Sequence, residues 1–283
     1  MIQYYHLNGN IIKAEEAQLK VGDLSILRGY GAFDFFLFEN GHPLFFDDYL
    51  NRFFNSASRL RLEISCTQKE LKSHILDLIR ANGQMQGGIR LVVTGGYAED
   101  GYTPLVPNWM ILQYPRPVYA PEKFEKGISL MTFQHQRELP EVKTINYITG
   151  IWLLDKIQAA NADDVLYHDG TYIRESVRSN FFIVSKEGTL ITPADKILLG
   201  ITRKQILEAV EGIIEVEERE VMLEELNHAQ EAFLTSSTKG AMPVVQIDGL
   251  EIGKGEPGPV TRQVMSLLRK RTQAYLEACT IKA

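Results

Sequence analysis

Residues 138–147 read Glu138-Leu139-Pro140-Glu141-Val142-Lys143-Thr144-Ile145-Asn146-Tyr147. This stretch places one lysine, Lys143, in an apolar and aromatic setting, which continues through Ile148, Ile151, Trp152 and Leu153. Burial or neighbouring cations can lower the pKa of a lysine and turn its amine into a nucleophile. Alternatively, Lys143 lies at a helix start with its stem buried and its ammonium group in water. Residues further along the chain favour the first interpretation.

The composition is that of a soluble globular protein. The 283 residues are 45% hydrophobic and 23% charged, which suits one large or two modest domains. A net charge of -6 argues against a nucleic-acid surface. No apolar stretch reaches the roughly 20 residues that span a membrane, and the first residues do not resemble a signal peptide. Cys66 and Cys279 stand far apart without metal-ligand neighbours, so we expect a cytoplasmic protein with no metal site.

The first hundred or so residues predict a compact α+β unit. An Asn40-Gly41 pair between two apolar segments is a hairpin signal. Thr67 and Glu70 form a capping box that begins a helix, and Gly83 ends it. The other expected elements are strands at 34–38, 43–46, 89–94 and 109–113, and a helix capped by Asp47 or Asp48.

Three prolines within residues 114–122 predict a linker, because proline stiffens the chain and cannot donate to a sheet. The linker divides a small α/β domain, residues 1–113, from a larger domain, residues 123–283. Short strands with tight turns fill the larger part and predict a barrel-like sheet with peripheral helices. The fold class is therefore α/β, of the two-domain α+β kind. The expected strands are 128–133, 165–168, 172–174, 180–185, 189–191, 214–218, 232–235 and 244–247, and the expected helices end near 160, 210 and 278.

Glu175 is a candidate acid for a pyridoxal phosphate site. That cofactor needs a lysine for its aldehyde, a carboxylate that keeps its ring nitrogen protonated, and a cradle for its phosphate. Alternatively, Glu175 is a glutamate on an edge strand that pairs with Arg174 or Arg178.

A phosphate seat is predicted at the start of the helix near residue 201. Gly200 permits close approach, and Thr202 with Gln205 forms a second capping box. The amides near Ile201 and Thr202 would face an anion, because the first N–H groups of a helix lack partners within it. Most helices with a threonine cap nevertheless bind nothing.

Two further segments could bind the same phosphate. Ser236 and Ser237 follow an apolar strand and offer hydroxyl and amide groups, although they could equally form an ordinary loop. Arg52 could supply a fixed positive charge, or it could be a solvated arginine on a helix.

Taken together and in this order, these segments resemble the fold-type-IV pyridoxal phosphate enzymes, the class-IV aminotransferases. That group includes the branched-chain aminotransferases, the D-amino-acid aminotransferases and aminodeoxychorismate lyase. The similarity runs from Arg28-Gly29-Tyr30-Gly31 to Met242-Pro243-Val244. It implies a small α/β domain joined to a larger barrel-like domain, with the cofactor between them. It also implies a homodimer in which the neighbour's small domain completes each substrate pocket.

The resemblance also implies roles for individual residues. Lys143 would be the Schiff-base lysine that moves the substrate's proton, and Glu175 the partner of the ring nitrogen. Tyr147 would donate to the phenolic oxygen of the cofactor, and Leu198 would pack on its ring. The phosphate-binding positions would be Arg52, Ile201, Thr202, Ser236 and Ser237.

The substrate is less clearly indicated, because the chain departs from both well-known patterns of the family. The Gly-Gly pair usual in branched-chain enzymes is missing between Lys143 and Asn146. The Arg-x-His pair that D-amino-acid enzymes use to bind a carboxylate is missing from residues 95–102, and Phe33 replaces their expected tyrosine. Arg28 and Arg90 could form a replacement carboxylate site, since a guanidinium binds carboxylates well, or each could be a structural ion pair.

We therefore expect a cytoplasmic, homodimeric transaminase that uses pyridoxal phosphate and binds neither nucleic acid nor membrane. The favoured donors are D-amino acids such as D-alanine or D-glutamate, with 2-oxoglutarate or pyruvate as acceptor. The alternative is a branched-chain L-amino-acid aminotransferase, followed by a lyase or an amine transaminase. A protein of another class, which binds the cofactor without turnover, is also conceivable. Arg178 could tune the cofactor's electrostatics or serve only at the surface.

Overall fold

The chain forms two compact units in a computed structural model, which describes residues 2–281 except for the side chain of residue 280. Unit 1 comprises the chain up to Pro117, the short segment Val142–Asn146, and the chain from Tyr275. Unit 2 comprises Val118–Glu141 and Tyr147–Ala274. The chain therefore leaves unit 2 for a short segment before returning to it, and Lys143 lies within that segment.

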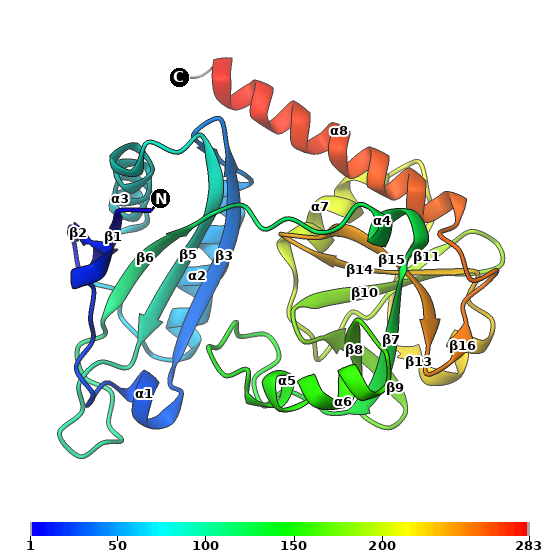
Figure 1. The fold of residues 1–283 in the computed structure, drawn as a ribbon, viewed down its shortest axis with the longest axis horizontal. Helices are drawn as coiled ribbons and strands as arrows, with labels where there is room; N and C mark the ends of the chain where they lie inside the picture. Colours follow the sequence, from blue (N-terminus) through cyan, green and yellow to red (C-terminus); the bar gives the residue numbers. More distant parts are fainter. Residues whose placement is uncertain (1, 282–283) are drawn as a thin grey trace. The chain divides into compact units, whose positions relative to one another are not determined.

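Unit 1 is built on a six-stranded sheet of order β2-β1-β6-β5-β3-β4 (Figure 1). Helix α2 packs on β3, and α3 packs on β1 and β6. The strands are β1 (Tyr4–Leu7), β2 (Asn10–Lys13), β3 (Gly31–Glu39), β4 (His42–Pro43), β5 (Gln86–Thr94) and β6 (Trp109–Tyr114). The helices are η1 (Ala14–Glu16), α1 (Leu24–Arg28), α2 (Phe46–Arg59) and α3 (Gln68–Asn82).

Most of the local structure predicted from sequence in unit 1 is confirmed. Asn40 and Gly41 form the β3–β4 turn with φ of 52° and 78°, which confirms the hairpin. The capping box of α3 and its end at Gly83 are also confirmed. The expected cap of α2 at Asp47 or Asp48 is wrong, because Phe45 is the N-cap, with φ of 49°.

Unit 2 is built on a ten-stranded sheet whose middle strands close on themselves. The path β10-β14-β15-β7-β8-β9 returns to β10 through the β9–β10 pairing, which confirms a barrel-like sheet (Figure 1). Its strands are β7 (Ile128–Gln134), β8 (Asp164–His168), β9 (Tyr172–Ser176), β10 (Ser179–Val184), β11 (Leu190–Thr192), β12 (Val216–Glu218), β13 (Val221–Met222), β14 (Glu231–Ser236), β15 (Gly240–Ile247) and β16 (Leu250–Glu251). Its helices are α4 (Glu122–Lys126), α5 (Ile148–Trp152), α6 (Leu154–Ala159), α7 (Ile201–Val210), η2 (Leu223–Asn227) and α8 (Pro259–Ile281), whose last residues lie in unit 1.

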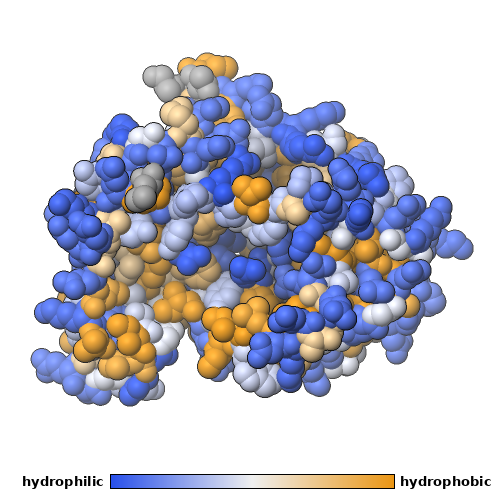
Figure 2. All heavy atoms as spheres, viewed as in Figure 1, coloured by the Kyte–Doolittle hydropathy of each residue, from blue (hydrophilic) through white to orange (hydrophobic). Residues whose placement is uncertain are grey.

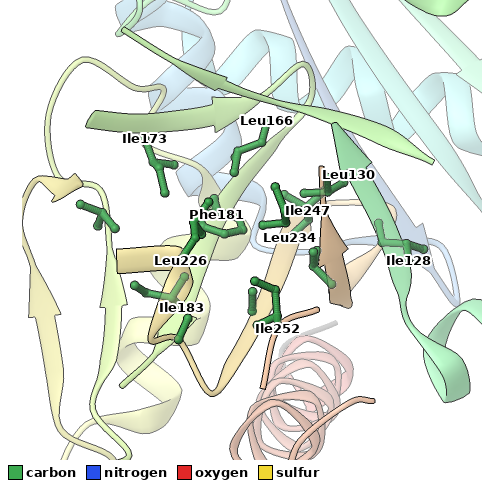
Figure 3. Close-up of a cluster of buried hydrophobic side chains, with 14 of the residues drawn as sticks. Ile128, Leu130, Leu166, Ile173, Phe181, Ile183, Leu226, Leu234, Ile247 and Ile252 are labelled. Carbon is green, nitrogen blue, oxygen red and sulfur yellow. The ribbon is translucent and has the colours of Figure 1, made fainter. Parts of the chain in front are cut away.

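Alternating residues of the barrel strands build two cores. Phe181 and Ile183 of β10 join the cluster drawn in Figure 3, where Leu166, Leu234 and Ile247 also point toward one another. The intervening residues of β10 join a second cluster with residues of α7 and α8. This alternation follows from the two-residue period of a strand, and it buries both faces of β10.

Two kinds of feature are absent from residues 2–281. No helix there combines the length and apolar character that a membrane span requires. No group of three or more histidine, cysteine, aspartate or glutamate side chains could hold a metal ion in that part of the chain.

Candidate active site

The residues singled out from the sequence divide between the two units. Unit 1 carries Arg28, Phe33, Arg52, Arg90 and Lys143. Unit 2 carries Tyr147, Glu175, Leu198, Ile201, Thr202, Ser236 and Ser237. Each unit therefore holds one coherent part of the expected site.

The Lys143 segment forms an extra strand-like pairing with the start of β3. The Phe33 amide donates to the Lys143 carbonyl over 2.9 Å, and the Ile145 amide donates to the Gly31 carbonyl over 3.0 Å. A Cβ on Gly31 would lie 2.5 Å from the Val93 carbonyl oxygen, so only glycine fits there. The backbone of Lys143 is thus held by the central sheet of unit 1.

The Lys143 amine lies over an aromatic ring that it shares with an arginine. Its Nζ is 4.6 Å from the centroid of the Phe33 ring, and the Arg90 guanidinium carbon is 5.6 Å from the same centroid. Phe33 of β3 therefore supplies apolar surface beside the Lys143 amine. The residues that follow Lys143 do not supply such surface as expected, since Ile148 and Trp152 are 71% and 59% exposed. Lys143 itself is half-buried rather than buried.

Arg52 is held by a buried carboxylate. Its Nε and Nη2 donate to the two oxygens of Asp34 over 2.9 and 2.6 Å, and the Asp34 side chain is fully buried. This pairing fixes the guanidinium and balances its charge. In an anion site, Arg52 would therefore offer hydrogen-bond donors in a fixed orientation more than it would offer net positive charge.

Arg28 lies elsewhere in unit 1, at the C-terminal end of α1. Its Nη1 donates to the Leu27 carbonyl over 2.8 Å, and the residue is exposed. The guanidinium faces the loop after β5, since a Cβ on Gly101 would be 3.9 Å from Arg28 Nη2.

Glu175 of β9 is bound on both carboxylate oxygens. Oε1 accepts from Arg137 Nε and Nη2 over 2.8 and 2.6 Å, and Oε2 accepts from the Leu198 amide over 3.1 Å. Asn180, the cross-strand partner of Glu175, donates to the Leu198 carbonyl over 2.7 Å. Leu198 is thereby held beside the carboxylate at both ends of its backbone.

The alternative for Glu175, a pairing with its neighbours Arg174 or Arg178, is wrong. Arg174 is buried and pairs with Asp169 and, at 3.5 Å, with Glu220. Arg178 is exposed in the β9–β10 turn. Adjacent residues of a strand point to opposite faces, which separates Arg174 from Glu175.

A close approach of the backbone to Asn180 marks the start of α7. The helix begins at Ile201 with Gly200 as its N-cap, and glycine has no side chain to occupy the first amides. A Cβ on Gly200 would lie 2.1 Å from Asn180 Oδ1, so the approach requires glycine. The helix N-terminus thus lies beside the strand pair that carries Glu175.

The expected capping box of Thr202 and Gln205 is wrong. Both residues lie inside the helix, whose N-cap is Gly200. Gln205 is buried, and its Oε1 accepts from Arg271 Nε of α8 over 2.6 Å. A tertiary contact has therefore replaced the local one.

The β14–β15 turn adds hydroxyl groups at the same end of the barrel. Thr235 pairs with Asn180 across β10 and β14, and Ser236 follows it and accepts from the Lys239 amide over 3.3 Å. The hydroxyls of Thr235 and Ser179 are buried and lack a hydrogen-bond partner within residues 2–281. Buried hydroxyls without a partner are uncommon, and these two lie on β10 and β14, the strands that also carry Asn180 and Ser236.

Tyr147 lies near a group of residues that sequence patterns did not reveal. It is the N-cap of α5, and it lies close enough to Tyr167 to contribute to the raised pKa of that residue. Burial, followed by the charges of Asp164 and Glu175, raises the pKa of Tyr167 to about 12. The His135 ring packs edge-on against Tyr167 at 4.8 Å, and burial lowers the pKa of His135.

The groups present match the needs of pyridoxal phosphate. Unit 2 offers a carboxylate, an aliphatic side chain and a seat of helix amides and hydroxyls at one end of its barrel. Unit 1 offers a lysine amine whose backbone is fixed by hydrogen bonds. Arg137 and Tyr167 belong to the same group, but sequence reasoning missed them because no local motif marks them; the Glu175 partner of Arg137 lies 38 residues away.

Comparison with known proteins shows the family to which the chain belongs. The family model for amino-transferase class IV matches residues 31–247. The D-alanine aminotransferase of Bacillus licheniformis is 31% identical over 273 residues, covering 93% of this chain and 94% of that protein. A putative branched-chain-amino-acid aminotransferase of Methanocaldococcus jannaschii is 33% identical over 273 residues, covering 92% and 93%.

Solved structures show the same fold. The branched-chain amino acid aminotransferase of Escherichia coli has a TM-score of 0.87 at 26% identity, covering 94% of this chain and 93% of that one. Another branched-chain amino acid aminotransferase, from T.th. and solved with pyridoxamine 5'-phosphate, has a TM-score of 0.89 at 25% identity, covering 97% and 95%. The chain therefore belongs to the class IV aminotransferases, which depend on pyridoxal phosphate.

Proposed function

We propose that Lys143 is the lysine that bonds the cofactor and that Glu175 faces the ring nitrogen. When bound, pyridoxal phosphate supplies an electron sink for the bond between the substrate's Cα and its hydrogen. The observation that carries the assignment is the pairing of Lys143 with β3, which holds its backbone while the amine stays half-buried beside Phe33. An amine held in this way could accept the proton from the substrate's Cα and then donate it to the bound cofactor.

The other cofactor contacts are proposed from the same geometry. Leu198, held by Glu175 and Asn180, would pack on the ring, and Tyr147 would donate to the phenolic oxygen. The phosphate would bind the first amides of α7, at Ile201 and Thr202, with the other donors supplied by Ser236, Ser237 and Arg52.

For substrate, we favour D-amino acids such as D-alanine or D-glutamate, with 2-oxoglutarate or pyruvate as acceptor. The segment from Lys143 to Asn146 is short and forms a direct pairing between Thr144 and Ala32 of β3. The D-alanine aminotransferase relative supports the same choice. A branched-chain L-amino-acid aminotransferase is the second candidate, supported by the M. jannaschii relative.

Arg90 is the better supported of the two carboxylate-binding candidates. Its guanidinium is exposed and flanks the same Phe33 ring as the Lys143 amine. A substrate bonded near Lys143 could thus place its carboxylate on Arg90, which offers planar paired donors. Arg28 remains a candidate for a different reason. It lies at the end of α1, in an apolar surface formed by α1 and the loop after β5, which a second subunit could cover.

That surface supports a homodimer. Helix α1 and the loop after β5 contact each other through the Leu24 amide and the Gly96 carbonyl. Figure 2 shows orange side chains gathered at the part of unit 1 where Figure 1 draws these segments. The exposed apolar residues are Val21, Ile26, Leu27, Tyr102, Leu105 and Val106, at 82%, 58%, 42%, 77%, 56% and 76%. Such a concentration of apolar side chains is typical of an interface, and residues of this surface could complete the neighbour's pocket.

Two further expectations are also kept as proposals. Residues 1–113 would be a small α/β domain and residues 123–283 a larger barrel-like domain, joined by the linker 114–122; the boundary between the two units after Pro117 supports this division. A cytoplasmic location is supported by the two free cysteines, Cys66 and Cys279.

Steady-state kinetics with D- and L-alanine, glutamate and leucine tests the substrate. We expect keto-acid formation from the D-donors, whereas strong L-leucine turnover with inactive D-donors would favour the branched-chain alternative. The Arg90→Ala variant should have a lower kcat/KM than the unchanged protein. The loss of a charge-assisted contact should remove about 1.5–3 kcal/mol of transition-state stabilisation. Arg116→Ala, which removes an exposed arginine paired with Glu39, is the control. Unchanged kinetics in both Arg90→Ala and Arg28→Ala would rule out the carboxylate assignment.

A further inference from the structure

Arg137 binds the carboxylate that the cofactor ring requires. It follows β7 closely, and its Nε and Nη2 lie 2.8 and 2.6 Å from Glu175 Oε1. The two side chains are only 21% and 8% exposed, so water screens their interaction weakly. With the Leu198 amide on Oε2, both oxygens of Glu175 are held by protein groups.

The same guanidinium also binds the loop that precedes Lys143. Arg137 Nη2 donates to the carbonyl oxygen of Pro140, three residues before the lysine. One side chain therefore restrains both the Glu175 carboxylate and the loop. Arginine suits this task because its planar donors reach two acceptors at once.

The charge of Arg137 has a second consequence for Glu175. A proton between a carboxylate and a ring nitrogen stays with the more basic partner. A neighbouring cation stabilises the ionised carboxylate and makes it the weaker base. Arg137 would thus favour the protonated ring, which withdraws electrons more strongly than a neutral one.

We propose that Arg137 is a positioning residue of the cofactor site, which orients Glu175 and keeps the shared proton on the cofactor's ring nitrogen. This inference rests on the proposed placement of pyridoxal phosphate against Glu175. The competing explanation is a purely structural ion pair that holds the loop through Pro140. The two explanations differ in whether the effect of Arg137 depends on Glu175.

The first measurement is the dissociation constant of pyridoxal phosphate from the apoenzyme of Arg137→Gln and Arg137→Lys. Loss of a contact between charged groups corresponds to a weakening of at least about tenfold for Arg137→Gln. Arg137→Lys should fall between Arg137→Gln and the unchanged protein, because it keeps the charge but loses one donor. Arg219→Gln is the matched control. It removes an arginine paired with Glu225 at 2.7 Å in the same unit and should leave cofactor affinity unchanged.

The second measurement separates positioning from structure. In a Glu175→Gln background, adding Arg137→Gln should weaken cofactor binding by less than about threefold, because the two residues act together. A full tenfold loss in that background would show that Arg137 acts through Pro140, and it would overturn the proposal. The melting temperature of each apoenzyme shows whether the variant is folded, and Arg137→Lys provides a second test if Arg137→Gln is not.

The third measurement observes the proton itself. With cofactor labelled with ¹⁵N in the ring, Arg137→Gln should move the nitrogen resonance toward that of unprotonated pyridine. An unchanged resonance would overturn the proposal even if affinity fell. Failure of the unchanged protein to bind pyridoxal phosphate would instead refute the proposed cofactor placement, so the two failures can be told apart.

Discussion

His6 makes the stability of unit 1 depend on pH. It lies on β1 at 1% exposure, with the rings of His74 and Trp109 at 4.5 and 4.7 Å. Neither ring nitrogen of His6 has a hydrogen-bond partner within residues 2–281. Burial, reinforced by the charge of His74 and opposed by that of Asp77, lowers the pKa of His6 to about 4.

The size and sign of the effect follow from that pKa. The unfolded chain takes up a proton on His6 near pH 6.5, whereas the folded chain does so only near pH 4. The stabilisation is therefore fully present above pH 6.5, decreases as the pH falls, and is lost below about pH 4. A difference of this size corresponds to roughly 3 kcal/mol in total, of which about 2 kcal/mol is lost between pH 7 and 5.

Urea unfolding of His6→Phe, followed by circular dichroism at pH 7 and pH 5, tests this reasoning. Other groups titrate in both proteins, so the unchanged protein should lose about 2 kcal/mol more than His6→Phe between the two pH values. His228→Phe, at an exposed position, should behave like the unchanged protein. Equal pH dependence in His6→Phe and the unchanged protein would refute the effect.

Three further substitutions test what stabilises each unit internally, and each is measured by thermal unfolding. Asp164→Ala should lower the free energy of unfolding by about 3–5 kcal/mol, because Asp164 is the counterion of the buried Lys239 ammonium, 2.7 Å away. A loss below about 1 kcal/mol, the range of an exposed pair, would contradict this. Gly31→Ala should lower the free energy of unfolding by about 1–3 kcal/mol, because its Cβ would lie 2.5 Å from the Val93 carbonyl oxygen; an unchanged melting temperature would mean that the backbone of β5 at Val93 can move aside. Thr67→Ala should cost about 1 kcal/mol through the lost cap of α3, and no loss would show that water replaces the cap.

Sequence patterns predicted the elements whose causes are local. The Asn40-Gly41 turn and the Thr67 cap depend on residues within one turn of the chain, and both are present. The start of α2 depends instead on Tyr275, whose hydroxyl accepts from the Phe46 amide over 3.0 Å and whose ring packs on Phe45 at 4.8 Å. That contact spans 229 residues, so no local pattern could reveal it.

The candidate site shows the same division. Glu175 could be identified because its position among the other motifs resembles a known family. Arg137 could not, because it lies 38 residues from Glu175 and follows a strand as many arginines do. Likewise the Lys143 segment was expected to lead into an apolar helix, and only the structure shows that it pairs with β3. Tertiary partners, which sequence spacing does not record, decide these cases.

The most direct test of the central claim is chemical modification of the lysine that holds the cofactor. The protein is reconstituted with pyridoxal phosphate, reduced with borohydride to fix the cofactor on its amine, digested and mapped by mass spectrometry. We predict that the label lies on the peptide containing Lys143. A label on another lysine, or none on fully reconstituted protein, would contradict the account.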